Sequence, residues 1–341
     1  MYCEAFVNAK TLYVVLFLFF LLPPSLASAG FIDVRDEDVK INSAVGLRGW
    51  FTRADAKWRI SFPYVTSGGQ AGKIESELRF NNIDSPLAIV TGAGKIASRF
   101  SFDVLYGTGD IARARGTDTD RFIPSSGSGL EFSQSQNDIS GDVTIWGGNI
   151  YYNNKLLPGA GSGPWGLVVG FLHYEDNLTL RSGVQTNTVP FELLNMPLGP
   201  FSGLNSTFNF EWNMLKMGVL RRAHLSKEFS YSGLLAVYPY VDYRGEGYWN
   251  LRAGTGPNDF RMQSPNFIQK SNKGYGYETS LELIYAISEN TELSAGYRYF
   301  YLYAENGTDT VYFADGTAAE STLDWVTVTR HGAYAELLFR F

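Results

Sequence analysis

Hydrophobic and polar residues alternate along much of this chain, and the pattern is clearest over residues 332–341. One face carries Ala333, Ala335, Leu337, Phe339 and Phe341, and the other carries Tyr334, Glu336, Leu338 and Arg340. Successive side chains of a strand point to opposite sides. Because one face is apolar and the other carries both charges, the pattern predicts a barrel strand with its apolar face in lipid.

The same two-residue period recurs upstream. Residues 206–220 alternate aromatic residues with Asn209, Glu211 and Asn213, and residues 274–287 alternate apolar residues with Glu278 and Glu282. Residues 73–80 form a further strand, which the pair 81–82 interrupts as a bulge. The ionisable residues expected to face the interior are Arg48, Glu75, Glu77, Arg79, Asp142, Glu211, Glu278, Glu282, Arg298, Glu336 and Arg340.

Ten such strands are expected, with short turns alternating with long polar connections. The long connections predicted as loops are residues 107–136, 175–205, 245–272 and 305–322, and residues 155–164 form one of the turns. A soluble β-sandwich would not alternate long and short connections so regularly. The sequence therefore predicts an all-β fold, a transmembrane antiparallel β-barrel of about ten strands with long extracellular loops and periplasmic termini.

The first 29 residues have the pattern of a secretory signal peptide. An apolar run over residues 11–22 follows Lys10, and small residues at 27–29 predict cleavage before Gly30. A retained membrane helix is the alternative, but the run is short and meets two prolines at 23–24. We therefore predict a signal peptide over 1–29 and a barrel over 30–341, in the outer membrane of a Gram-negative bacterium and in contact with its lipid.

The amino-acid composition excludes several kinds of catalytic and binding chemistry. The single cysteine, Cys3, leaves with the signal peptide, so thiol catalysis, disulfides and Cys-ligated metals are excluded from the mature chain. The 24 Phe, 21 Tyr and 36 Gly residues suit aromatic girdles and glycine-rich turns. A net charge of −6 argues against nucleic acid as a partner. No motif for a cofactor or a metal is present.

The expected interior holds charges of both signs. In a barrel of about ten strands, side chains nearly fill the lumen. Paired carboxylates and guanidinium groups therefore favour a closed structural network over a narrow diffusion pore. The terminal Phe341 also resembles the C-terminal signature of bacterial outer-membrane barrels, which implies recognition by the barrel-assembly machinery.

The order of motifs resembles the omptin family of outer-membrane proteases. The similarity lies in residues 73–82, in the Asp-x-Asp of Asp118 and Asp120, in residues 165–171 and in the closing hairpins. It implies a ten-stranded barrel that cleaves peptides with a water held between an Asp pair and an Asp-His pair. Asp118 and Asp120 match the first pair. The resemblance also implies lipopolysaccharide as a required lipid, bound by outward basic residues near the rim.

The second pair of the omptin motif is missing. Gly245 and Gly247 stand at the positions matching its acid and its histidine, and a glycine can neither take nor relay a proton. Glu246 and His173 are the remaining candidates for a base. We therefore predict a non-proteolytic barrel that acts as a structural or surface-binding protein, with an extracellular protein or peptide as partner at its loops. The alternatives are a divergent endopeptidase using Asp118, Asp120, Glu246 and His173, and a narrow diffusion porin.

Overall fold

A computed structural model describes residues 43–341 of the chain, apart from 98–99, 155–164, 192–196 and 253–261. The predicted signal peptide and the turn at 155–164 lie outside the described residues. The strands are β1 (Ser43–Val65), β2 (Ala71–Ala97), β3 (Phe100–Pro124), β4 (Leu130–Asn154), β5 (Trp165–Thr188), β6 (Gly199–Pro200), β7 (Ser206–His224), β8 (Phe229–Tyr248), β9 (Met262–Ser271), β10 (Gly274–Ser288), β11 (Thr291–Phe313) and β12 (Ala318–Arg340). A 3-10 helix, η2 (Asn250–Arg252), follows β8.

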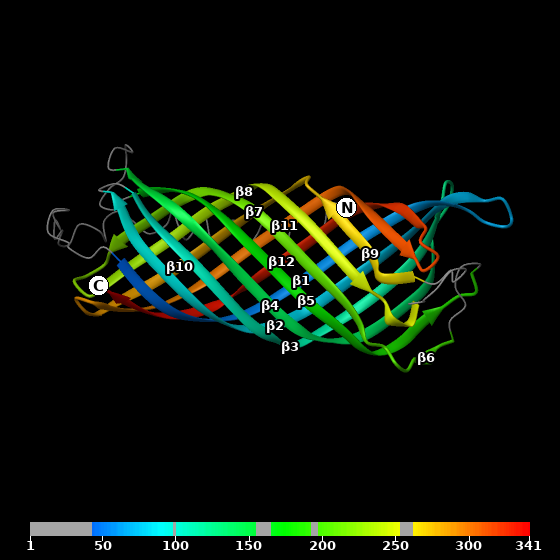
Figure 1. The fold of residues 1–341 in the computed structure, drawn as a ribbon, viewed down its shortest axis with the longest axis horizontal. Coiled ribbons are helices and arrows are strands. Elements are labelled where there is room, and N and C mark those ends of the chain that lie inside the picture. The colour runs from blue at the N-terminus through cyan, green and yellow to red at the C-terminus, as the bar shows by residue number, and fades with distance from the viewer. Residues whose placement is uncertain (1–42, 98–99, 155–164, 192–196, 253–261) are drawn as a thin grey trace.

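The strands form one closed antiparallel barrel (Figure 1). Pairing of β1 with β12 closes the ring, from Ala44 opposite Arg340 to Ser61 opposite Thr322. Segments β9 and β10 share one position in the ring, since both pair with β8 on one side and β11 on the other. The two-residue β6 only extends the edge of β5. The ring therefore has ten strand positions, as predicted.

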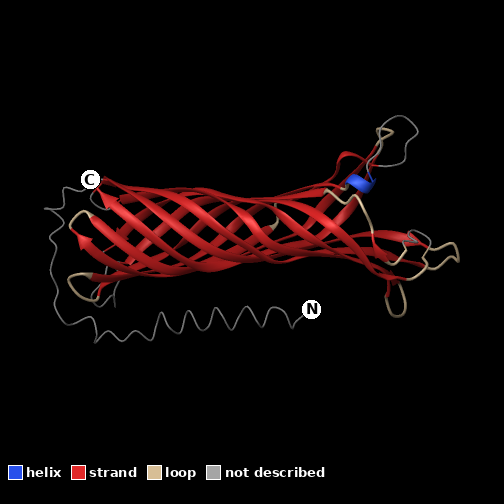
Figure 2. Cartoon of the chain, turned by 90° about the horizontal axis from the view of Figure 1, so that it is seen from below, coloured by secondary structure: helices blue, strands red, loops and turns tan. Residues whose placement is uncertain are grey.

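Most strands are longer than a membrane crossing requires. Strands β1 to β5, β11 and β12 contain 23 to 27 residues, whereas a tilted transmembrane strand needs about 9–11. The result is an elongated barrel, with the C-terminus at one end and η2 at the other (Figure 2). We call these the turn end and the loop end. Among the described residues no helix is long and apolar enough to cross a membrane.

Much of the predicted loop sequence is strand. Only residues 125–129 connect β3 to β4, and only 314–317 connect β11 to β12, so the predicted loops 107–136 and 305–322 were wrong over most of their length. The predicted loops 175–205 and 245–272 likewise begin in strand, and β9 lies within the second of them. Polar composition suggested loops there, but a strand surrounded by water rather than lipid can carry polar residues on its outer face.

An apolar band surrounds the turn-end half of the barrel. Its outward side chains include Leu47, Phe51, Val169, Leu215 and Ile287, all well exposed. Along β1 the outward positions change from Phe51 to Arg53 and Asp55, so the apolar band ends there and the outer wall becomes charged. The lipid-facing alternation predicted from residues 332–341 belongs to this band.

β-bulges change which side chains face inward. Asn82, Ser182 and Asn306 have positive φ angles of 52–54°. The β2 register shifts between Asn81 and Asp84, which confirms the predicted bulge. On the turn-end side of this bulge odd-numbered residues such as Ile83 and Leu87 are buried, and on the other side even-numbered residues such as Leu78 and Phe80 are buried. One added residue thus reverses the inward face of the strand.

Candidate functional site

The sequence-predicted carboxylates Asp118 and Asp120 lie inside the loop-end half of the barrel. They share the inward face of β3 with Phe122, and the register places Asp118 beside Leu78 and Asp120 beside Ser76 on β2. The Ser76 hydroxyl donates to Asp118 Oδ1 at 3.4 Å. The two carboxylates are therefore brought together on one wall, as their spacing predicted.

Burial strongly perturbs this pair. Desolvation, followed by the neighbouring Asp120 charge, raises the pKa of Asp118 to about 7. Desolvation also raises the pKa of Asp120, although Ser76, Arg252 and Ser133 partly oppose the shift. One proton is thus retained on the pair near neutral pH, as expected when two carboxylates share a poorly solvated site.

This proton links stability to pH. Folded Asp118 keeps its proton up to about pH 7, whereas an unfolded aspartate releases it near the model value of 3.8. Stability present at low pH is therefore lost as the pH rises from about 4 to about 7, by at most about 4 kcal/mol. Asp118→Asn has no proton to lose, so we expect its free energy of unfolding in urea to fall less between pH 4 and pH 8 than that of the wild type.

Asp120→Asn serves as the matched variant for this experiment. It removes the neighbouring charge and so lowers the folded-state pKa of Asp118; in this variant the loss of stability should still begin near pH 4 but should end at a lower pH than in the wild type. Equal losses between pH 4 and pH 8 in the wild type and in Asp118→Asn would contradict the assignment of the retained proton to Asp118.

The two candidate bases face away from this pair. Glu246 lies on the outer wall of β8, where its Oε2 pairs with Arg244 Nη2 at 3.0 Å. His173 lies on the outer wall of β5, stacked on Trp146 at 5.0 Å, with its Nδ1 2.9 Å from Asn213 Oδ1. The side chains of Tyr243 on β8 and Tyr174 on β5 are buried inside the barrel. Glu246 and His173 lie on the opposite faces of these strands and therefore point outward. The structure therefore does not bring Glu246 or His173 together with Asp118 and Asp120.

The positions that match the missing Asp-His pair do face inward, but no room is left at them. A Cβ atom built at Gly247 would overlap the ring of Phe267, and one built at Gly245 would overlap the Tyr243 hydroxyl. The ring of Trp58 on β1 lies 5.9 Å from Phe208 and 6.1 Å from Phe267. Aromatic rings thus fill the space next to the glycines.

Aromatic contacts cross the barrel at several levels. Trp58 on β1 meets Phe208 on β7, the strand on the opposite side of the ring. Phe80 on β2 packs edge-on against Phe210 on β7 at 5.4 Å. We call this set the aromatic core; its main members are Trp50, Trp58, Phe80, Tyr174, Phe208, Phe210, Trp212, Tyr243, Phe267 and Phe300.

A buried ion pair crosses the barrel at the middle of the aromatic core. Arg330 Nη2 on β12 lies 2.8 Å from Asp176 Oδ1 on β5, and both side chains have 0% exposure. Arg330 also donates to the Tyr174 hydroxyl at 2.9 Å and to the Thr52 hydroxyl at 2.5 Å. The alternating pattern of the sequence did not predict this pair. One feature of the sequence could have indicated a buried Asp176: it lies on the same strand face as the apolar residues Leu172 and Leu178.

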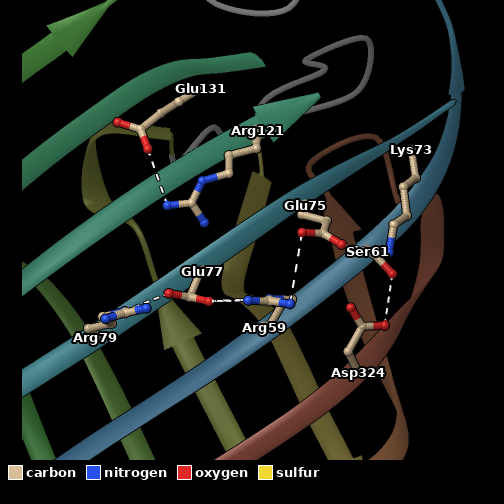
Figure 3. Close-up of polar contacts among 9 residues, drawn as sticks. All are labelled: Arg59, Ser61, Lys73, Glu75, Glu77, Arg79, Arg121, Glu131 and Asp324. Atoms are coloured by element: carbon tan, nitrogen blue, oxygen red, sulfur yellow. Dashed lines mark hydrogen bonds and ion pairs between the residues drawn. The ribbon is translucent and has the colours of Figure 1, made fainter. Parts of the chain in front are cut away.

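Several ionisable residues expected inside the barrel lie on its outer wall. Glu77 receives hydrogen bonds from Arg59 and Arg79, each at 2.5 Å, and Lys73 pairs with Glu75 at 2.5 Å (Figure 3). The residues wrongly predicted to face inward are Glu75, Glu77, Arg79, Asp142 and Glu211. They lie beyond the apolar band, where the outer wall meets water and the apolar face turns inward.

The inward prediction is confirmed nearer the turn end. Arg48 Nη2 lies 2.6 Å from Glu336 Oε2. Glu278 pairs with Lys216 at 2.8 Å and with Arg298 at 2.9 Å. Within the apolar band these charges lie inside the barrel, where they pair away from lipid.

Comparisons with known proteins agree with this architecture. The family model described as Pom, Protochlamydia outer membrane protein, matches residues 47–331. The crystal structure of outer membrane protease OmpT from Escherichia coli superposes with a TM-score of 0.69 at 14% identity, covering 90% of this chain and 100% of that one. The omptin-like fold is therefore confirmed. At 14% identity this likeness concerns the fold and not the activity.

Other solved barrels are less similar. The translocator domain of the autotransporter NalP from Neisseria meningitidis gives a TM-score of 0.33 at 11% identity, covering 99% of this chain and 96% of that one. A Pseudomonas aeruginosa FadL homologue gives 0.29 at 7% identity, covering 88% and 90%. No curated protein matches the chain.

Proposed function

This chain belongs to the Protochlamydia outer membrane protein family, and from that premise we propose that it is a closed, non-proteolytic barrel that acts at the cell surface. The loop end faces the outside of the cell and the turn end faces the periplasm. Its role is structural or surface-binding, through the part of the barrel wall and the connections that extend beyond the apolar band.

The packing of side chains across the lumen carries this proposal. Trp58, Phe208 and Phe267 occupy the space beside Gly245 and Gly247, where an omptin-like protease would need its second pair. The same rings, together with the Arg330–Asp176 pair, leave the barrel without an evident path for solutes along its axis. Both alternatives, the endopeptidase and the diffusion porin, require space at this level.

The charged outer wall supports surface binding. Beyond the apolar band, β1 to β4 present the network of Arg59, Glu77 and Arg79 and the pair of Arg121 with Glu131 (Figure 3). The guanidinium groups of Arg59, Arg79 and Arg121 are partly exposed on the outside of the wall, where an extracellular protein or peptide can reach them, and the first two cover the buried Glu77. Lipopolysaccharide binding by basic residues of this wall, and recognition of the exposed Phe341 by the barrel-assembly machinery, stay predictions.

A conductance measurement tests the closed lumen. We expect the refolded protein in planar lipid bilayers to show no steady single-channel current, because the rings of opposite strands are in contact. The matched variant is Phe208→Ala with Phe267→Ala, which removes two rings of the aromatic core and should raise the current above that of the wild type. Large, stable channels formed by the wild-type protein would contradict the proposal and favour the porin.

A further inference from the structure

A polar cavity of about 210 Å³ lies on the barrel axis within the apolar band. Residues from β1, β2, β3, β4, β7, β8, β10, β11 and β12 line it, so it is enclosed by nearly the whole ring. The aromatic core lies on its loop-end side, where Trp50 stacks below the guanidinium group of Arg298 at 5.2 Å. The cavity is thus separate from the Asp118 and Asp120 pair.

The charges that line the cavity do not balance. Three cations face four carboxylates, namely Arg48, Lys216 and Arg298 against Asp103, Glu278, Glu282 and Glu336. The ion pairs described above use Glu336 for Arg48 and Glu278 for both Lys216 and Arg298. Among the described residues, no Lys or Arg forms an ion pair with Asp103 or Glu282.

Neutral groups make the hydrogen bonds to these two carboxylates, while the charge of Arg48 acts on Glu282 from beyond ion-pair distance. Asp103 accepts hydrogen bonds from the Asn149 amide, at 2.7 Å, and from the Tyr151 hydroxyl. Glu282 accepts one from the Ser294 hydroxyl at 2.6 Å. Asp103 lies on β3 and Glu282 on β10, which occupy opposite positions in the ring. The cavity therefore has, on each of two facing walls, a carboxylate that no described Lys or Arg contacts directly.

We propose that this cavity binds a small organic cation, a short linear diamine, with one ammonium group at Asp103 and the other at Glu282. A buried carboxylate is stabilised by a cationic partner that also donates hydrogen bonds. A water-sized group takes about 30 Å³, so the cavity of about 210 Å³ has room for the six heavy atoms of 1,4-diaminobutane. The ring of Tyr151, which lines the cavity, provides an apolar surface for the methylene chain between the two charges.

Titration calorimetry of the refolded mature protein with 1,4-diaminobutane tests this proposal. We expect saturable binding of one diamine per chain. Asp103→Asn combined with Glu282→Gln keeps the shape of both side chains and should weaken binding at least ~10-fold, since each removes a charge-assisted hydrogen bond. Glu246→Gln, on the outer wall, is the matched control and should leave the affinity unchanged.

Butylamine provides a comparison that needs no variant. It has the same chain length but a single ammonium group, so the wild-type protein should bind it at least ~10-fold more weakly than the diamine. The proposal is overturned if the wild type shows no saturable binding, or if butylamine and 1,4-diaminobutane bind equally well. It is also overturned if a correctly folded Asp103→Asn, Glu282→Gln protein keeps the wild-type affinity.

Discussion

Replacing Arg330 by methionine should lower the free energy of unfolding by about 3–5 kcal/mol, because it leaves the Asp176 carboxylate buried without its partner. Both side chains have 0% exposure, and the pair lies 2.8 Å apart between opposite strands of the ring. The Tyr174 and Thr52 hydroxyls would also lose the donor that they share. Urea titrations in lipid vesicles, followed by tryptophan fluorescence, give this quantity.

Two further variants show whether the loss of stability in Arg330→Met comes from the unpaired Asp176 carboxylate. Arg330→Met combined with Asp176→Leu removes both charges and should recover most of the loss, because an apolar pair of similar size replaces a buried ion pair at little cost. Arg53→Met breaks the pair with Asp84, whose side chains are 54% and 31% exposed, and should cost at most about 1 kcal/mol. If Arg330→Met costs no more than Arg53→Met, the buried pair does not stabilise the barrel as we infer.

Restoring the omptin-like residues should not restore proteolysis. We expect no peptide cleavage above background from the wild-type protein with lipopolysaccharide present, because a missing acid–base pair removes ~10²–10⁴-fold in rate. We expect none from Gly245→Asp with Gly247→His either, since the Tyr243 hydroxyl and the Phe267 ring occupy the space that these side chains need. The rate at which each refolded protein, the wild type and the double variant, cleaves a fluorogenic peptide measures these two activities.

Steric crowding can be tested apart from chemistry. Gly247→Ala should destabilise the barrel by about 1–3 kcal/mol, as overpacking does, whereas Gly49→Ala should be nearly neutral because no atom lies within 4 Å of its added Cβ. If the wild type cleaves the peptide robustly and Asp118→Ala abolishes this cleavage, the protein is a protease that uses Asp118, contrary to our proposal. Weak cleavage gained by the double glycine variant would show that the aromatic core moves aside.

The local pattern of residues was enough to predict the ring and its strands. The alternation at 274–287 corresponds to β10, Gly274–Ser288, and the one at 206–220 lies within β7. Within the apolar band the rule of apolar outside and charged inside also placed Arg48, Glu278 and Arg298 correctly. The Asp-x-Asp spacing was enough to put Asp118 and Asp120 on one face, because a strand has a period of two.

The same period could not say which face is the inside once a strand leaves the lipid. Glu77 and Arg79 follow the alternation but lie on the outer wall, since their segment of β2 is surrounded by water and a bulge at Asn82 shifts the register by one. Likewise Trp58 and Phe208, 150 positions apart in the sequence, meet only because closure of the ring sets β1 opposite β7. Contacts across a barrel depend on strand order and stagger, which bring together residues with no local relation. The filled space beside Gly247, the Arg330–Asp176 pair and the cavity between Asp103 and Glu282 are therefore products of the tertiary structure.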